Sequence, residues 1–184
     1  MENYTYILGP CSIESEDNFL EVAKTLSGYM GDKDWYLKGS FDKANRTSIH
    51  SDRGPGLDEG IKIMQMVKEY YPNVKIVTDI HEASQALPLS DVVDVIQIPA
   101  FLCRQTDLLV ACAKNFNIIN IKKGQWLSAE AMEHAVTKIK EVDPNCEVWI
   151  TERGSQFGYD RLIVDFRGVD VMKKFADKVI LDCT

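Results

Sequence analysis

Long apolar runs are missing from this sequence of 184 residues, and no stretch approaches the roughly 20 apolar residues that a membrane-spanning helix needs. The first residues also lack the basic and apolar segments of a secretory signal. We therefore expect a cytoplasmic protein with no membrane partner. The five cysteines are an odd number and include no Cys-x-x-Cys pair, which argues against a disulfide framework and a local zinc knuckle.

An excess of positive charge is also absent, because 28 Asp and Glu outnumber 21 Lys and Arg and give a net charge of −7. This balance argues against nucleic acid as a partner. Against the acidic background, the segment Lys38–Gly56 concentrates four cations and three glycines directly after the apolar run Trp35–Leu37. In an α/β protein, such a loop after a buried strand is a place to hold a phosphorylated ligand.

Short apolar runs alternate with amphipathic segments along the whole chain, without a linker, so we expect one domain over residues 1–184. The expected strands are residues 4–8, 35–37, 75–80, 92–98, 118–121, 147–151 and 179–182. The expected helices are residues 16–29, 57–70, 82–90, 106–113, 129–141 and 171–176, with Ser15 and Ser128 as caps of the first and fifth.

This alternation predicts an α/β fold with a parallel sheet. Seven β units fit a (β/α)₈ TIM barrel with only about seven of its eight strands present, since such barrels usually need roughly 250 residues. An open doubly wound sheet is the alternative. No Gly-x-Gly-x-x-Gly follows the first strand, which weighs against a dinucleotide-binding fold.

Ligands of parallel α/β folds bind at the carboxyl ends of the strands, where this sequence places many polar groups. In strand order these are Cys11; Lys38, Ser40 and Lys43; Asp79 and His81; Gln97 and Arg104; Lys122 and Lys123; Glu152 and Arg153; and Asp182. Each cation taken singly is as well explained by an ion pair with a neighbouring carboxylate. As a set they favour a ligand with phosphate and carboxylate groups. Cys11 suits either a metal ligand or a buried thiol.

Six segments carry a resemblance to a known family: Gly9–Ser15, Lys43–Ser48, Arg53–Gly56, Ile98–Asp107, Asn120–Gln125 and Thr151–Gly154. They resemble 3-deoxy-D-manno-octulosonate 8-phosphate synthase, and the similarity runs from about Tyr6 to the last residue. The resemblance implies a (β/α)₈ barrel that condenses phosphoenolpyruvate with arabinose 5-phosphate for lipopolysaccharide synthesis. The related synthase of the shikimate pathway uses erythrose 4-phosphate and has proline where Ala44 and Asn45 stand here, so we expect the five-carbon sugar.

The resemblance also assigns roles, with Lys38, Lys43, Lys122 and Asp79 as catalytic residues. The phosphoenolpyruvate ligands would be Lys38, Ser40, Lys43, Gln97, Lys122 and Arg153. The sugar phosphate ligands would be Asn45, Arg46, Thr47 and Asp79. Since the family forms homotetramers, Arg104 is expected to reach the sugar phosphate of a neighbouring subunit.

Cys11 places the sequence with the metal-dependent members of the family, because the metal-independent members have asparagine at this position. The resemblance therefore implies a divalent metal ion, whose other family ligands would lie beyond residue 184. We expect a chain that lacks the C-terminal part of an enzyme. The competing hypothesis is a short protein that binds phosphoenolpyruvate or a phosphosugar without turnover.

Overall fold

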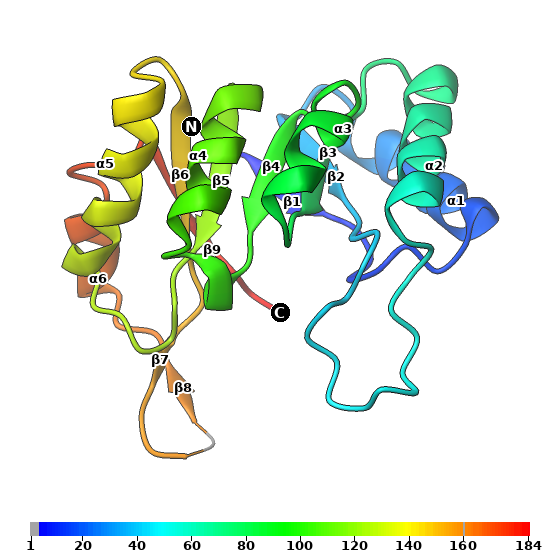
Figure 1. The fold of residues 1–184 in the computed structure, drawn as a ribbon. Coiled ribbons are helices and arrows are strands. Elements are labelled where there is room, and N and C mark those ends of the chain that lie inside the picture. Colours follow the sequence, from blue (N-terminus) through cyan, green and yellow to red (C-terminus); the bar gives the residue numbers. More distant parts are fainter. Residues whose placement is uncertain (1–3, 160) are drawn as a thin grey trace. The chain divides into compact units, whose positions relative to one another are not determined.

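The computed structural model describes residues 4–159 and 161–184, and the chain divides into two compact units. The first unit comprises Met1–Asp79 and Pro88–Val95, and the second comprises Ile80–Leu87 and Ile96–Thr184. Strands and helices alternate along both units (Figure 1). Over the described residues, every helix is too short or too polar to cross a membrane.

The first unit contains three parallel strands and two helices that lie side by side (Figure 1). Its elements are β1 (Tyr6–Leu8), α1 (Glu16–Met30), β2 (Trp35–Lys38), α2 (Leu57–Tyr70) and β3 (Lys75–Asp79). The strands pair in the order β1-β2-β3, with Leu37 opposite Ile76 in the register. The side chain of Ser15 accepts a hydrogen bond from the backbone amide of Asn18, which confirms the predicted cap of α1.

The second unit contains parallel strands and the helices that connect them. The strands are β4 (Val95–Ile98), β5 (Ile118–Lys122), β6 (Glu147–Glu152) and β9 (Lys178–Leu181). The helices are α4 (Thr106–Asn115), α5 (Glu133–Val142) and α6 (Arg167–Met172), with short 3₁₀ turns η1 (Ala83–Gln85), η2 (Ala100–Leu102) and η3 (Glu130–Met132). Helix α3 (Ala86–Ser90) precedes β4 and has residues in both units. In the second unit, β7 (Ser155–Gln156) pairs with β8 (Leu162–Ile163) as an antiparallel hairpin.

Strand order follows chain order in each unit, β1-β2-β3 in the first and β4-β5-β6-β9 in the second. A doubly wound sheet would reverse its strand order at a switch point, and neither unit does so. Most residues of β5 and β6 are fully buried, as expected for parallel strands covered on both faces. The α/β prediction of the barrel type, with seven parallel strands, is therefore confirmed.

Three of the expected elements are wrong in detail. The strand expected from residue 92 begins only at Val95, because the amides of Val92 and Val93 bond to the Leu89 carbonyl and close a turn. The last helix begins at Arg167 and ends at Met172, earlier than expected. The hairpin β7–β8 lies within a segment expected to be a loop, and its Leu162 and Ile163 are half exposed.

Close packing at Gly9 brings the carboxyl end of β1 against that of β2. Gly9 has φ +146°, and a Cβ atom there would lie 2.1 Å from the carbonyl oxygen of Lys38. Since this contact is with backbone, glycine is required where the chain leaves β1. The same contact fixes the backbone of Lys38, whose side chain carries charge at the end of β2.

Candidate functional site

The β2–β3 cluster consists of Lys38 at the end of β2, Asp79 at the end of β3, and Lys43 in the loop after β2. The two ammonium groups lie 3.4 Å and 3.7 Å from the same carboxylate oxygen of Asp79. All three side chains are mostly buried, with exposed fractions of 16, 16 and 10%. Positive charge exceeds negative charge by one among these groups, in a setting where charges are weakly screened. The cluster is therefore suited to bind an anion.

The loop of residues 39–56 is closed at its base by backbone and side-chain contacts. The amide of Lys43 donates to the carbonyl of Arg53 at 2.6 Å, and the amide of Gly56 donates to that of Phe41 at 2.9 Å. Arg53 makes a bidentate ion pair with Asp42, and the hydrogen bond and charge of that carboxylate raise the pKa of the Arg53 guanidinium. The base of the loop thus holds Lys43 beside the end of β3.

The tip of this loop carries the three residues predicted to bind the sugar phosphate. Asn45, Arg46 and Thr47 are all exposed. The Nε of Arg46 donates to the carbonyl of Asp52 at 3.1 Å, which ties the tip back to the loop. The predicted sugar ligands are therefore presented to solvent on a loop with a closed base.

Ser40 has a structural role. Its hydroxyl is fully buried and donates to the carbonyl of Asp42 at 2.8 Å, while its own carbonyl accepts from the amide of Ile13. These bonds fix the start of the loop. The role predicted for Ser40 in binding phosphoenolpyruvate stays a prediction.

The β5–β9 cluster pairs Lys122, at the end of β5, with Asp182, which follows β9. The ammonium group lies 3.0 Å from the carboxylate, and the side chains are 24 and 13% exposed. Partial burial alone would raise the pKa of Asp182, but hydrogen bonds from Thr184 and from Lys122 outweigh it and lower the pKa to about 2. Asp182 is therefore charged throughout the neutral range. Arg153, which follows β6, is half-buried.

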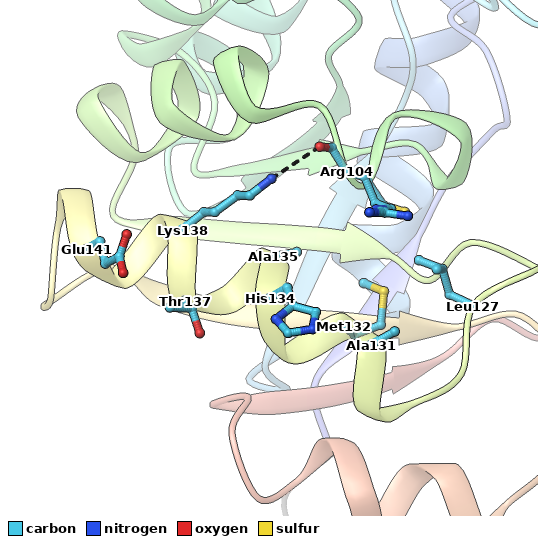
Figure 2. Close-up of a pocket in the computed structure, with 10 residues that line it drawn as sticks. Arg104, Leu127, Ala131, Met132, His134, Ala135, Thr137, Lys138 and Glu141 are labelled. Atoms are coloured by element: carbon cyan, nitrogen blue, oxygen red, sulfur yellow. Dashed lines mark hydrogen bonds between the residues drawn. The ribbon is translucent and has the colours of Figure 1, made fainter.

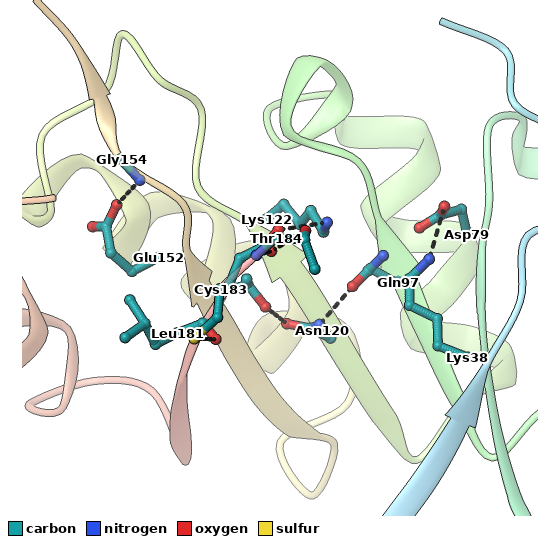
Figure 3. A network of polar contacts seen from close by, with 12 residues as sticks. Lys38, Asp79, Gln97, Asn120, Lys122, Glu152, Gly154, Leu181, Cys183 and Thr184 are labelled. Atoms are coloured by element: carbon teal, nitrogen blue, oxygen red, sulfur yellow. Dashed lines mark hydrogen bonds and ion pairs between the residues drawn. The ribbon is translucent and has the colours of Figure 1, made fainter. Parts of the chain in front are cut away.

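Three buried polar side chains form a hydrogen-bonded chain across β4, β5 and β6: Gln97, Asn120 and Thr151. Figure 3 shows the contact between Gln97 and Asn120. The Thr151 hydroxyl donates to Asn120 Oδ1 at 2.8 Å, and Asn120 Nδ2 donates to Gln97 Oε1 at 3.0 Å. Sequence reasoning singled out Gln97 and missed the other two. The available signal was a polar side chain inside an apolar strand, at a position that shares a sheet face with Lys122.

A buried ion pair, Lys123 with Glu152, was also missed as a distinct feature. The ammonium group lies 3.6 Å from Glu152 Oε1, and the two side chains are 2 and 3% exposed. The ammonium also contacts three backbone carbonyls and one hydroxyl, those of Gly124, Leu127, Gly154 and Ser155. Lys123 therefore holds the loops after β5 and β6, whereas its neighbour Lys122 keeps partial access to solvent.

A pocket of about 390 Å³ lies along the helices of the second unit, lined largely by residues of η3 and α5 (Figure 2). Of the predicted site residues it contains Arg104, whose carbonyl accepts a hydrogen bond from Lys138. Phe101 and Trp126, both exposed, stack with ring centroids 5.7 Å apart near this part of the chain. The pocket thus places Arg104 among residues of η3 and α5.

Cys11 follows β1 and its side chain is exposed. Across residues 4–159 and 161–184, no three His, Cys, Asp or Glu side chains lie close enough together to hold a metal ion. The residues described here therefore do not fit a metal site around Cys11 by themselves.

The chain is similar to proteins from several bacteria. A protein of Campylobacter jejuni subsp. doylei is 50% identical over 196 aligned residues, covering 100% of this chain and 73% of the relative. A protein of Koribacter versatilis is 49% identical over 180 residues, with coverages of 97 and 64%. A Wolinella succinogenes protein is 46% identical over 190 residues, with coverages of 97 and 72%. All three are named 2-dehydro-3-deoxyphosphooctonate aldolase.

That name is a synonym for the synthase that the six sequence segments resemble. A family model described as the DAHP synthetase I family matches residues 2–184. The match spans nearly the whole chain and includes both strand-end clusters. With this match and relatives near half identity, the chain belongs to the DAHP synthetase I family, in the group of 2-dehydro-3-deoxyphosphooctonate aldolases.

Proposed function

We propose that this chain condenses phosphoenolpyruvate with D-arabinose 5-phosphate, giving 3-deoxy-D-manno-octulosonate 8-phosphate and inorganic phosphate for lipopolysaccharide biosynthesis. The names of the relatives support the reaction. The observation that carries the proposal is the β2–β3 cluster, where Lys38 and Lys43 share the single carboxylate of Asp79. Two mostly buried cations beside the same carboxylate favour an anionic substrate.

In the proposed reaction, C3 of phosphoenolpyruvate attacks the sugar aldehyde, whose oxygen takes up a proton. Positive charge then develops at C2, water adds there, and the C2–O bond to phosphate breaks. The protein has to orient two anionic substrates and stabilise their charges as they react. Lys38, Lys43 and Lys122 are proposed to do this for phosphoenolpyruvate, together with Gln97 and Arg153.

The sugar phosphate is assigned to the exposed loop tip of Asn45, Arg46 and Thr47, with Asp79 at the end of β3. The closed base of the loop supports this assignment, because it joins the two arms that lead to the tip beside Lys43. We propose also that the chain forms a homotetramer in which the exposed Arg104 contacts a neighbouring subunit's sugar phosphate. The cytoplasmic location stays a prediction.

Phosphate release from phosphoenolpyruvate tests the proposed function. We expect release with arabinose 5-phosphate and clearly less with erythrose 4-phosphate, because Ala44 and Asn45 stand where the shikimate synthase has proline. A preference for the four-carbon sugar would overturn the choice of substrate. Binding of phosphoenolpyruvate without release, by a chain of intact mass near 20.8 kDa, would instead favour the non-catalytic alternative.

We propose further that Cys11 is one ligand of a divalent metal ion, although the described residues do not supply the other ligands. Replacing Cys11 by asparagine should lower the metal content of the purified chain and remove any effect of a chelator. Elemental analysis of both proteins measures the metal directly, without reference to activity. Equal metal content in both proteins, or none in either, contradicts this role of Cys11.

A further inference from the structure

The loop of residues 39–56 leaves β2 and returns to α2 as two arms (Figure 1). The two arms are joined at Arg53. Its carbonyl accepts a hydrogen bond from the amide of Lys43 at 2.6 Å. Its guanidinium donates two bonds to the Asp42 carboxylate, from Nε at 2.8 Å and from Nη2 at 2.5 Å. One residue of the returning arm thus holds two successive residues of the outgoing arm.

The outgoing arm is anchored immediately before Lys43. The carbonyl of Asp42 accepts a hydrogen bond at 2.8 Å from the hydroxyl of Ser40, and Ser40 is fully buried. Lys43 follows directly, and its ammonium group lies 3.7 Å from the carboxylate of Asp79. The place of this ammonium group therefore depends on how the arms are joined at residues 42 and 53.

The returning arm packs directly against the same segment. Gly54 has φ +103°, and a Cβ atom there would lie 2.8 Å from the carbonyl oxygen of Phe41. The amide of Gly56 donates to that same carbonyl at 2.9 Å. Since these contacts are with backbone, the residue after Arg53 has to be glycine for the arm to come this close. The close approach brings the Arg53 guanidinium within reach of Asp42.

The ion pair between Asp42 and Arg53 is open to solvent on one side, with side chains 20 and 56% exposed. Exposed ion pairs contribute little to stability, whereas a bidentate pair fixes the orientation of its two members. We propose that Asp42 and Arg53 are positioning residues, a clamp between the arms that holds Lys43 beside Asp79 for the anionic groups of phosphoenolpyruvate. This inference rests on the proposed function, because it takes Lys43 as a ligand of that substrate.

The test replaces Asp42 by asparagine, which keeps the shape of the side chain and turns an NH₂ group toward one of the two Arg53 donors. The bidentate pair is then lost. The change also removes a negative charge, so a role through charge alone predicts tighter binding of an anion. The clamp predicts the opposite. We expect the dissociation constant of phosphoenolpyruvate, measured by calorimetry on the whole chain, to rise about 5- to 20-fold. Unchanged or tighter binding overturns the positioning role.

Asp165→Asn is the matched control. Asp165 makes a similar bidentate pair with Arg167 at the start of α6, in the second unit. The same change there should leave phosphoenolpyruvate binding unchanged, and an equal weakening would contradict the clamp. Arg53→Lys keeps the positive charge but cannot form the bidentate pair, so it should weaken binding as well. Wild-type binding by Arg53→Lys would also overturn the clamp.

A double-mutant cycle with Lys43→Met shows whether the clamp acts through Lys43. If it does, Asp42→Asn should have no further effect on binding in the Lys43→Met background. Equal effects in both backgrounds would overturn the positioning role alone. If Lys43→Met itself leaves phosphoenolpyruvate binding unchanged, the clamp fails together with the assignment of Lys43 under the proposed function.

Discussion

Replacing Lys123 by methionine should lower the free energy of unfolding by about 3–5 kcal/mol, because the change leaves the carboxylate of Glu152 buried without its counter-charge. The two side chains are 2 and 3% exposed, so water cannot replace the lost partner. Three backbone carbonyls and the Ser155 hydroxyl lose the same ammonium group. Urea denaturation of the two proteins at neutral pH measures the difference.

The adjacent lysine provides a matched control. Lys122→Met removes the same group one residue earlier, but its partner Asp182 is 13% exposed and keeps two hydrogen bonds from Thr184. We expect a loss of only about 1 kcal/mol there. Adding Glu152→Gln to Lys123→Met should recover much of the stability, since it removes the unpaired charge and keeps an acceptor for the Gly154 amide. Equal losses at the two lysines would contradict this account.

The main elements of the fold could be predicted because each carries a local signal. The apolar side chains of α2 recur at helical spacing, and its predicted range, Leu57–Tyr70, is the observed one. The β7–β8 hairpin has no such signal, because each strand has two residues and Leu162 and Ile163 are half exposed. The start of β4 was predicted wrongly for another reason. Val92 and Val93 are apolar and buried like strand residues, but they lie in a turn.

The charged strand ends could be predicted in kind but not in detail. The alternative explanation for each cation was an ion pair with a neighbouring carboxylate. Such ion pairs are observed for Lys38, Lys43 and Lys122. The ion pairs do not exclude a ligand, since Lys38 and Lys43 share one carboxylate. The sequence could not separate Lys122 from Lys123, because the difference between them is burial. The Lys123 ammonium group is surrounded by carbonyls from the loops after β5 and β6. The sequence around the two lysines does not reveal which of them these loops will cover.

Replacing Lys122 by methionine should reduce kcat/KM for phosphoenolpyruvate by about 10²- to 10³-fold, under the proposed function. Methionine keeps most of the length of the side chain and removes the cation that is proposed to stabilise the substrate's anionic groups. Asp182 adds to the loss, because its carboxylate loses its counter-charge while it keeps the hydrogen bonds from Thr184. Steady-state kinetics with saturating arabinose 5-phosphate measures the change.

Two further variants separate the contributions of charge. Lys122→Met combined with Asp182→Asn removes both members of the ion pair, so it should recover the part of the loss that comes from repulsion by Asp182 and no more. Lys122→Arg keeps the charge and should lose less than methionine, with a remaining deficit because guanidinium geometry differs from that of an ammonium group. If Lys122→Met retained wild-type kcat/KM while its stability fell, Lys122 would be a partner of Asp182 that holds the ends of β5 and β9 together, and not a substrate ligand.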